Sequence, residues 1–268
     1  MQVADTPADE LLWLVRYLER ERFDATSEGL EAWSTDDLWA RFRSLVNTRE
    51  PQPASDEFYA RQDALLRSLI DEAGVTDAES LPRSEADGRL SVWRGDITTI
   101  RADAIVNAAN SQMLGWWVPG HRCIDNAIHT FAGVELREEC ARIMAAQGHE
   151  EPPARAKVTS GYNLPAAHII HTVGPIAGGR PTARHRLQLA ECYESCLDSA
   201  AGAGCHSVVF CCISTGIFGF PQREAAEIAV RTVRRWLDAH AADSATTVDH
   251  VVFNVFLPAD EQIYRSLI

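Results

Sequence analysis

The segment "ADAIVNAA", residues 102–109, is short and apolar, with β-branched side chains at its centre, as a strand buried inside a sheet is. Four other segments share this character: "LSVWRG" (90–95), "HIIHTVG" (168–174), "SVVFCCIS" (207–214) and "HVVFNVFL" (250–257). Segments with helical spacing of apolar residues alternate with them, namely residues 123–146, 186–204 and 222–241. This alternation predicts an α/β fold with helices on both faces of a sheet, a three-layer α/β/α sandwich.

The residues before this region have the pattern of three helices, at 6–21, 34–48 and 55–74. In each of them a Ser or Thr precedes an acidic first turn, and apolar residues return at three- and four-residue spacing. We therefore predict a helical N-terminal extension over residues 1–86 and a main domain over 87–268. The extension carries no recognisable chemistry, so we expect its helices to pack on the main domain and to shape one rim of its pocket.

Composition restricts the class of protein. The 25 Lys and Arg face 38 Asp and Glu, a formal charge of -13 that repels the nucleic-acid backbone. The start of the chain is acidic, and no apolar run approaches the ~20 residues needed to cross a bilayer, so we predict a cytoplasmic protein. Seven cysteines, an odd number, are expected to remain thiols or to bind metal rather than to form disulfides.

In α/β sheets, ligands bind outside the carboxyl ends of the strands, where two unusual segments lie. The segment "CISTGIFGFP" (212–221) has the small residues Ser214, Thr215, Gly216 and Gly219 between a strand and a helix. Small residues let backbone N–H groups approach an anion such as a pyrophosphate at a helix N-terminus. The segment lacks the Walker lysine and the G-x-G-x-x-G spacing, so an ordinary tight turn is the alternative.

Two further polar features adjoin this edge of the sheet. Asp96 lies in a turn between two strand-like segments, where its carboxylate can accept from an exocyclic amine such as that of adenine, or can simply cap the turn. Asn107 and Asn110 lie at the end of a buried strand, where unsatisfied amides are costly. These asparagines therefore indicate either a polar ligand or a network that braces a loop.

Together these segments resemble a known family. "GDITTIRADAIVNAAN" (95–110), "IDNAIH" (124–129), "AKVTSGYNLPAAHIIHTVGP" (156–175) and "CISTGIFGFP" are similar to the macrodomain, in order and spacing, over roughly residues 88–268. The resemblance implies an ADP-ribose-binding fold in which Asp96 and Ile97 hold adenine and Asn110 and Asp125 face the distal ribose. It also implies that the "STGIFG" loop wraps the pyrophosphate, which adds Ser214, Thr215, Gly216, Ile217 and Phe218 to the expected binding residues.

The chain departs from the usual hydrolytic macrodomain at two places. It has "LGWWVPGHRCI" (114–124) where a glycine-rich loop is usual, and "FCCIS" (210–214) where many relatives have "FPCIS". In this it resembles the zinc-containing branch, often encoded beside a sirtuin-type ADP-ribosyltransferase. We therefore expect one Zn²⁺ per chain, held by His121, Cys123 and Cys211, with Cys212 as the rival third ligand. Three protein ligands would leave the fourth position open, as in catalytic zinc sites.

Other residues near these motifs are given simpler interpretations. His129 is interpreted as bracing the loop rather than as a ligand. Trp116 and Trp117 could cover the distal ribose, select the modified side chain, or simply pack.

The sequence thus predicts a zinc-dependent hydrolase that removes mono-ADP-ribose from Asp or Glu side chains of proteins. Asn110 would orient the ribose, and Asp125 would position or deprotonate the attacking water. The expected partners are ADP-ribose and a mono-ADP-ribosylated protein, with a lipoyl-carrier protein as one candidate, and neither nucleic acid nor a membrane. Two alternatives stay open: a non-catalytic reader of ADP-ribose with structural zinc, and a deacetylase of O-acetyl-ADP-ribose. Four protein ligands would indicate a closed structural zinc, and three a catalytic one.

Overall fold

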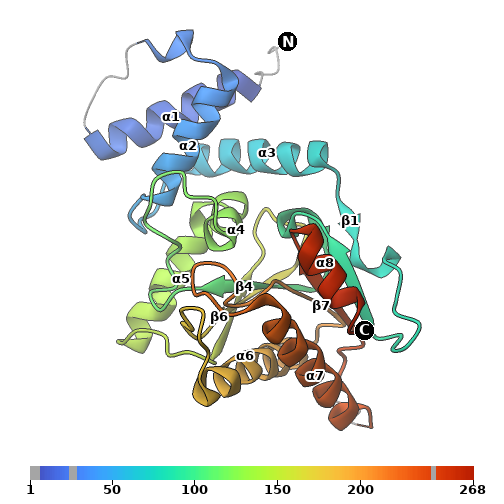
Figure 1. The fold of residues 1–268 in the computed structure, drawn as a ribbon. Helices are drawn as coiled ribbons and strands as arrows, with labels where there is room; N and C mark the ends of the chain where they lie inside the picture. The colour runs from blue at the N-terminus through green and yellow to red at the C-terminus, as the bar shows by residue number, and fades with distance from the viewer. Residues whose placement is uncertain (1–6, 24–28, 243–245) are drawn as a thin grey trace.

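A computed structural model of the chain describes residues 7–23, 29–242 and 246–268 (Figure 1). Its centre is a six-stranded sheet in the order β2-β8-β7-β4-β6-β5. Neighbouring strands are parallel, except that β5 runs antiparallel to β6 at one edge. The strands are β2 (Leu90–Arg94), β4 (Ala104–Ala109), β5 (Ala156–Ser160), β6 (His168–Val173), β7 (Ser207–Phe210) and β8 (His250–Val255).

Helices cover both faces of this sheet. The helices α6 (Ala183–Gly202) and α7 (Gln222–His240) pack on each other on one face, and α4 (Ile124–Ala132) and α5 (Val134–Gln147) lie on the other (Figure 1). A last helix, α8 (Pro258–Arg265), contacts β2, β8 and α7. The predicted three-layer sandwich is confirmed, and its inner strands are buried on both sides, as their mainly apolar sequences require.

Three details differ from the sequence prediction. The predicted helix over 123–146 is two helices, because Gly133 adopts φ 106° between α4 and α5, a conformation that other residues rarely adopt. The predicted strand 207–214 ends at Phe210, so Cys211 and Cys212 lie in the turn that follows it. The edge strand β5 was not predicted, because its half-exposed residues lack an apolar run.

The N-terminal extension consists of α1 (Pro7–Phe23), η1 (Leu30–Ala32), α2 (Thr35–Asn47) and α3 (Asp56–Ala73). The Ser34 and Ser55 hydroxyls cap α2 and α3 as predicted, whereas Thr6, the predicted cap of the first helix, lies outside the described residues. These helices bury an apolar cluster of their own, which Val134 of α5 completes. They also bond to the main domain, where Asn47 Nδ2 donates to Thr130 Oγ1 over 3.1 Å.

The connection from α3 to the sheet packs on the main domain, since Ala78 belongs to its apolar core. The short strands β1 (Thr76–Asp77) and β3 (Ile100–Arg101) pair with each other, and two 3₁₀ turns, η2 (Ala78–Ser80) and η3 (Ile97–Thr99), accompany them. The predicted boundary at residues 86–87 falls in the loop between η2 and β2. In the described part of the chain, no helix is both long enough and apolar enough to cross a membrane.

Candidate active site

A cavity of about 410 Å³ opens beyond the carboxyl ends of β4, β6 and β7. Its volume is within the range of ~300–1,000 Å³ that small-molecule sites have. Its walls come from the end of β4, the segment 116–125, Gly174 after β6, and the turn after β7: Ala108, Ala109, Asn110, Trp116, His121, Arg122, Cys123, Ile124, Asp125, Gly174, Cys212, Ser214, Gly216, Ile217 and Phe218. The fold therefore brings the two segments singled out in the sequence to one cavity.

Asp125, near the start of α4, is the buried carboxylate of this cavity. Burial raises the pKa of Asp125 to about 6, although a hydrogen bond from Asn107 opposes the shift. Asn107 Nδ2 donates to Asp125 Oδ1 over 2.8 Å, and Asn110 Nδ2 lies 3.4 Å from Asp125 Oδ2. Both asparagines therefore hold the carboxylate, and Asn110 also faces the cavity.

The segment between Asn110 and Asp125 is held by its own hydrogen bonds. Asn110 Nδ2 donates to the Gly115 carbonyl over 2.9 Å and so braces the loop, which was one of the two alternatives for the asparagines. The Trp116 backbone N–H donates to Asn126 Oδ1 over 2.7 Å, and the Trp116 carbonyl accepts from Asn126 Nδ2 over 2.9 Å. Trp116 lines the cavity and stacks on His121, whereas Trp117 packs against the Arg137 guanidinium.

The predicted zinc ligands lie close to this loop but are not assembled around one point. His121 Nδ1 accepts from the Cys123 backbone N–H over 3.2 Å, and Cys123 Sγ caps α4 by accepting from the Asn126 N–H over 3.4 Å. Cys212 lines the same cavity, whereas Cys211 is buried beside it and burial raises its pKa to about 12. In residues 7–23, 29–242 and 246–268, no three His, Cys, Asp or Glu side chains are gathered closely enough to hold a metal.

The donor types nevertheless suit zinc. Imidazole and thiolate are its usual protein ligands, and His121 Nδ1, which accepts from the Cys123 N–H, is the ring nitrogen that has a lone pair. His121 and Cys123 share the cavity wall with Cys212, but the Cys212 thiol donates to the Asn254 carbonyl over 3.7 Å, and Cys211 is within electrostatic reach of Asp125, so neither cysteine is singled out as the third ligand. The set fits zinc in chemistry, and a third ligand would have to move into place.

The turn after β7 has the features of an anion-binding loop. Ser214 adopts φ 66°, in the left-handed region, and its buried Oγ has no hydrogen-bond partner. A Cβ at Gly174 would lie 2.1 Å from that Oγ, so this glycine leaves the space open. Gly216, Ile217 and Phe218 continue the wall, whereas Thr215 turns away and donates to the Cys212 carbonyl over 2.9 Å.

Asp96 and Ile97 lie next to the cavity rather than in its wall. Asp96 Oδ1 accepts from the Thr98 N–H over 2.9 Å and from Thr98 Oγ1 over 2.7 Å, so the carboxylate caps η3. Ile97 is buried. Gly95, beside Asp96, donates its N–H to the carbonyl of Val255, the last residue of β8. Asp96 therefore lies where β2 and β8 end together.

Two residues that the sequence interpretation missed lie around this end of the cavity. Phe256 follows β8 directly and is 75% exposed, which is unusual for so large an apolar side chain. Arg43 of α2 has a buried Nε without a hydrogen-bond partner, and its guanidinium is within electrostatic reach of Arg122, Asp96 and Cys123. An aromatic residue directly after a strand could have been noticed; a lone arginine on a helix gives no signal.

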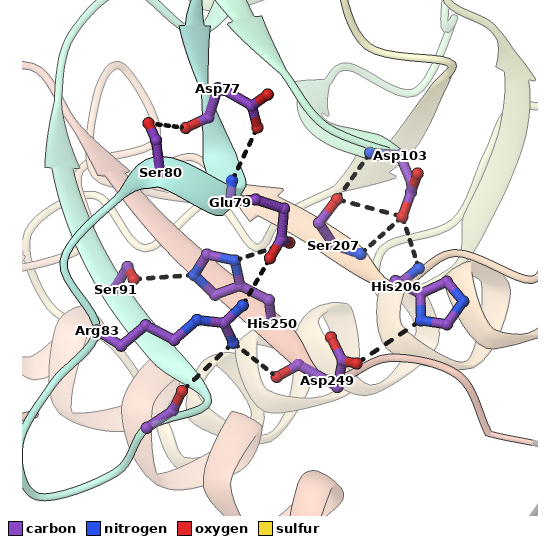
Figure 2. Close-up of polar contacts among 11 residues, drawn as sticks. Asp77, Glu79, Ser80, Arg83, Ser91, Asp103, His206, Ser207, Asp249 and His250 are labelled. Atoms are coloured by element: carbon purple, nitrogen blue, oxygen red, sulfur yellow. Dashed lines mark hydrogen bonds and ion pairs between the residues drawn. The ribbon is translucent and has the colours of Figure 1, made fainter.

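A second, more open cavity of about 740 Å³ lies at the opposite, amino ends of the strands. Figure 2 shows the polar contacts in and beside it: Asp103 accepts from the backbone N–H groups of His206 and Ser207, and Arg83 donates to Glu79 and to the Asp249 carbonyl. His250 is fully buried between Ser91 and Glu79. The acidic side chains here already have protein partners, so this cavity offers few free groups to a ligand.

Comparison with known proteins agrees with this geometry. Residues 106–229 match the model of the Macro domain family. The chain is 47% identical over 265 residues to a Treponema medium protein named "Protein-ADP-ribose hydrolase", covering 98% of this chain and 99% of that protein. It is 50% identical over 245 residues to a Fusarium oxysporum f. sp. cubense "Probable bifunctional ADP-ribose hydrolase/ADP-ribosyltransferase", covering 85% of this chain and 40% of that protein.

The fold matches as well. A mutant of the Oceanobacillus iheyensis macrodomain, solved with ADPR, superimposes with a TM-score of 0.59 at 36% identity, covering 66% of this chain and 90% of that one. The full-length identity, the family model and the shared fold agree with one another. The chain belongs to the macrodomain family.

Proposed function

We propose that this protein is a zinc-dependent protein-ADP-ribose hydrolase that removes mono-ADP-ribose from Asp or Glu side chains. One observation carries the proposal: a buried carboxylate, Asp125, held by two asparagines in a cavity whose far wall has the unpartnered Ser214 Oγ. The full-length relationship to a protein named as such a hydrolase supports the same activity.

ADP-ribose would lie along the cavity with its adenine toward Asp96. The exocyclic amine of adenine can donate to Asp96, whose Oδ1 bonds leave acceptor capacity on Oδ2. The exposed ring of Phe256, beside the same strand end, can stack on the base. The orphaned Ser214 Oγ and the backbone of the 214–218 turn would bind the diphosphate.

Positive charge from Arg122 and Arg43 would complement the diphosphate from the opposite rim. Arg122 lines the cavity, and Arg43 reaches it from the N-terminal extension. The α2 helix contacts this rim directly, since a Cβ at Gly120 would lie 3.3 Å from Ser44 Oγ. The expectation that the extension shapes one rim of the pocket is thereby supported.

At the other end, the distal ribose would meet Asn110 and Asp125. Hydrolysis adds one water across the ester, which returns a free carboxylic acid on the protein and a hydroxyl on ADP-ribose. Asn110, which faces the cavity, would orient the ribose. Asp125 would position or deprotonate the water, and its two asparagine bonds fix the direction of its carboxylate.

His121 and Cys123 would hold the zinc, with Cys211, or its rival Cys212, as the third ligand. When bound, zinc supplies a Lewis acid that polarises a ribose or ester oxygen, or lowers the pKa of a water molecule. Trp116 stacks on His121 and so orients that ligand.

The protein substrate would be one that a functionally linked ADP-ribosyltransferase modifies. The name of the Fusarium relative joins a hydrolase and an ADP-ribosyltransferase in one protein, which supports a functional link to such an enzyme. A sirtuin-type transferase and a lipoyl-carrier protein are the candidates for partner and substrate. We propose that the protein works in the cytoplasm.

A paired experiment tests the function. Wild-type protein, before and after chelation, is assayed for release of ADP-ribose from an aspartyl- or glutamyl-modified protein and, by calorimetry, for binding of free ADP-ribose. We expect one zinc per chain by elemental analysis, loss of release on chelation with recovery on adding zinc, and little change in binding. Equal turnover without zinc would contradict the zinc dependence. No turnover with tight binding would favour the reader, and cleavage of O-acetyl-ADP-ribose alone would favour the deacetylase.

A further inference from the structure

A line of buried polar groups runs from Asp125 into the interior of the sheet. Asn107 of β4 donates to Asp125 Oδ1 over 2.8 Å, and the same Nδ2 lies 3.1 Å from His171 Nδ1. His171 is the register partner of Asn107 on β6, and its Nε2 lies 2.9 Å from Thr159 Oγ1 on β5. The line therefore crosses three adjacent strands and ends at the proposed catalytic carboxylate.

Chemistry allows one assignment of protons along this line. An ionised carboxylate only accepts, so the amide nitrogen of Asn107 must face Asp125. The second proton of that nitrogen then points at His171 Nδ1, which must accept and carry no proton. The His171 proton is therefore on Nε2 and is donated to Thr159 Oγ1, whose own proton points toward the Ser160 carbonyl at 3.4 Å.

Burial keeps this arrangement in place. Asn107 and His171 have no exposed surface, and burial lowers the pKa of His171 to about 3, so the imidazole stays neutral. Polar groups in the middle of an otherwise apolar sheet lower stability unless they are bonded, and apolar side chains would pack there at less cost. Three such groups in one line indicate a role beyond packing.

We propose that His171 and Thr159 are positioning residues that fix the Asn107 amide and, through it, the direction of the Asp125 carboxylate. This inference rests on the proposed hydrolase activity. Without the His171 acceptor, the Asn107 amide can rotate, and its oxygen would then face Asp125 and repel it. The line acts on turnover rather than on ADP-ribose affinity, because neither residue lines the cavity.

The first test compares two conservative substitutions of Thr159, the last residue of the line. Thr159→Val removes the hydroxyl at nearly constant volume, and Thr159→Ser keeps it. We expect Thr159→Val to lower kcat about 10-fold, as outer-shell substitutions commonly do, and Thr159→Ser to recover most of it. The Kd for ADP-ribose should stay within about 3-fold of wild type in both, since binding groups are untouched.

The second test uses a matched histidine at the other end of the sheet. His250 is equally buried and also bonds a hydroxyl, with Nε2 2.8 Å from Ser91 Oγ (Figure 2). His171→Leu should lower kcat by about 10- to 100-fold. His250→Leu should lower the Tm by a similar amount with kcat near that of wild type. Equal kcat in the two histidine variants, or in the two Thr159 variants, would overturn the inference.

A direct measurement covers the case in which His171→Leu does not fold. The ¹⁵N chemical shifts of His171 in the wild-type protein should report a neutral ring protonated at Nε2, and a proton on Nδ1 would overturn the assignment. The two proposals fail separately. A wild type that releases no ADP-ribose contradicts the hydrolase, whereas an active wild type, an inactive Asp125→Ala and a fully active Thr159→Val contradict only the positioning role.

Discussion

The two ends of the sheet carry cavities that contain the same kinds of charged group but differ in chemistry. The wall at the carboxyl ends has one Asp, one His and one Arg, whereas the larger cavity at the amino ends, about 740 Å³ against 410 Å³, has four carboxylates with Arg101 and His206. At the amino ends Asp103, Arg83 and His250 each bond to protein groups. At the carboxyl ends Ser214 Oγ and Arg43 Nε are buried without hydrogen-bond partners.

This difference favours the cavity at the carboxyl ends as the ligand site. A buried polar atom without a partner costs about 1–3 kcal/mol, and a ligand that bonds Ser214 Oγ would recover that cost. Substitutions of matched residues at the two ends should therefore affect different quantities. At the carboxyl ends they should change turnover or affinity, and at the amino ends they should change only stability.

The largest effect is expected for the carboxylates. Asp125→Ala should lower kcat by more than ~100-fold, as loss of a general base does, with ADP-ribose binding nearly unchanged. Asp103→Ala should leave kcat unchanged and lower the free energy of unfolding by ~1–3 kcal/mol, because two backbone N–H groups lose their acceptor. Turnover assays measure kcat, and urea unfolding measures the free energy of unfolding. A loss of kcat in Asp103→Ala would contradict the distinction between a ligand site and a structural cavity.

A second comparison uses two aspartates that cap 3₁₀ turns. Asp96 caps η3, and Asp77 caps η2 by accepting from the Glu79 N–H over 3.0 Å. Asp96→Ala should weaken ADP-ribose binding by about 10- to 150-fold, equivalent to ~1.5–3 kcal/mol for a hydrogen bond to a charged group. Asp77→Ala should leave the affinity unchanged in the same calorimetric titration. Unchanged affinity in Asp96→Ala would reduce that residue to a turn cap.

Lowering the pH should reveal how much the neutral, buried His171 contributes to stability. The folded-state pKa of His171, about 3, lies below the unfolded value near 6.5, so the unfolded chain binds more protons between these values. Stability is therefore lost as the pH falls through about 6.5, by ~1.4 kcal/mol between pH 7.5 and 5.5. His171→Leu should lack that contribution in urea unfolding at the two pH values, although Cys140 and His129 lie next to the ring. A wild type and variant with the same pH dependence would contradict the neutral buried ring.

The smallest effect is expected for the arginines. Arg43→Ala should weaken ADP-ribose binding by about 5-fold, near 1 kcal/mol for a partly exposed charge, and should not change the affinity for uncharged adenosine. Arg83→Ala, at the amino ends, should change neither affinity. Titrations with both ligands at two salt concentrations test this, and an equal loss for adenosine would mean that Arg43 acts through packing alone.

The sequence was most informative where local rules decide the structure. Ser34 and Ser55 begin helices as predicted, because a cap is set by its own few residues. The break at Gly133 was not foreseen, since the apolar periodicity continues across it. The helix stops because Gly133 has φ 106°, outside the helical region, and a larger residue would not fit, since a Cβ would lie 2.7 Å from Gln62 Nε2 of α3.

The candidate site also contains residues that the sequence could predict and residues that it could not. Asp125, Asn110 and Ser214 lie in one cavity, because the carboxyl ends of parallel strands meet at one edge. Cys211 and Cys212 could not be ranked, because the strand ends at Phe210 and alternation no longer applies to them. Arg43 could not be found at all, since only tertiary packing brings α2 to the rim.

The sheet order also sets when the site can form during synthesis. β2, residues 90–94, is an edge strand whose one neighbour in the six-stranded sheet is β8, residues 250–255. A ribosome adding ~5–20 residues per second supplies that neighbour roughly 8–30 s after β2 emerges. A nascent chain can thus assemble β4, β6 and β7, with Asp125 beside them, before β8 is available. The end of the cavity next to Asp96 can form only after β8 has been synthesised.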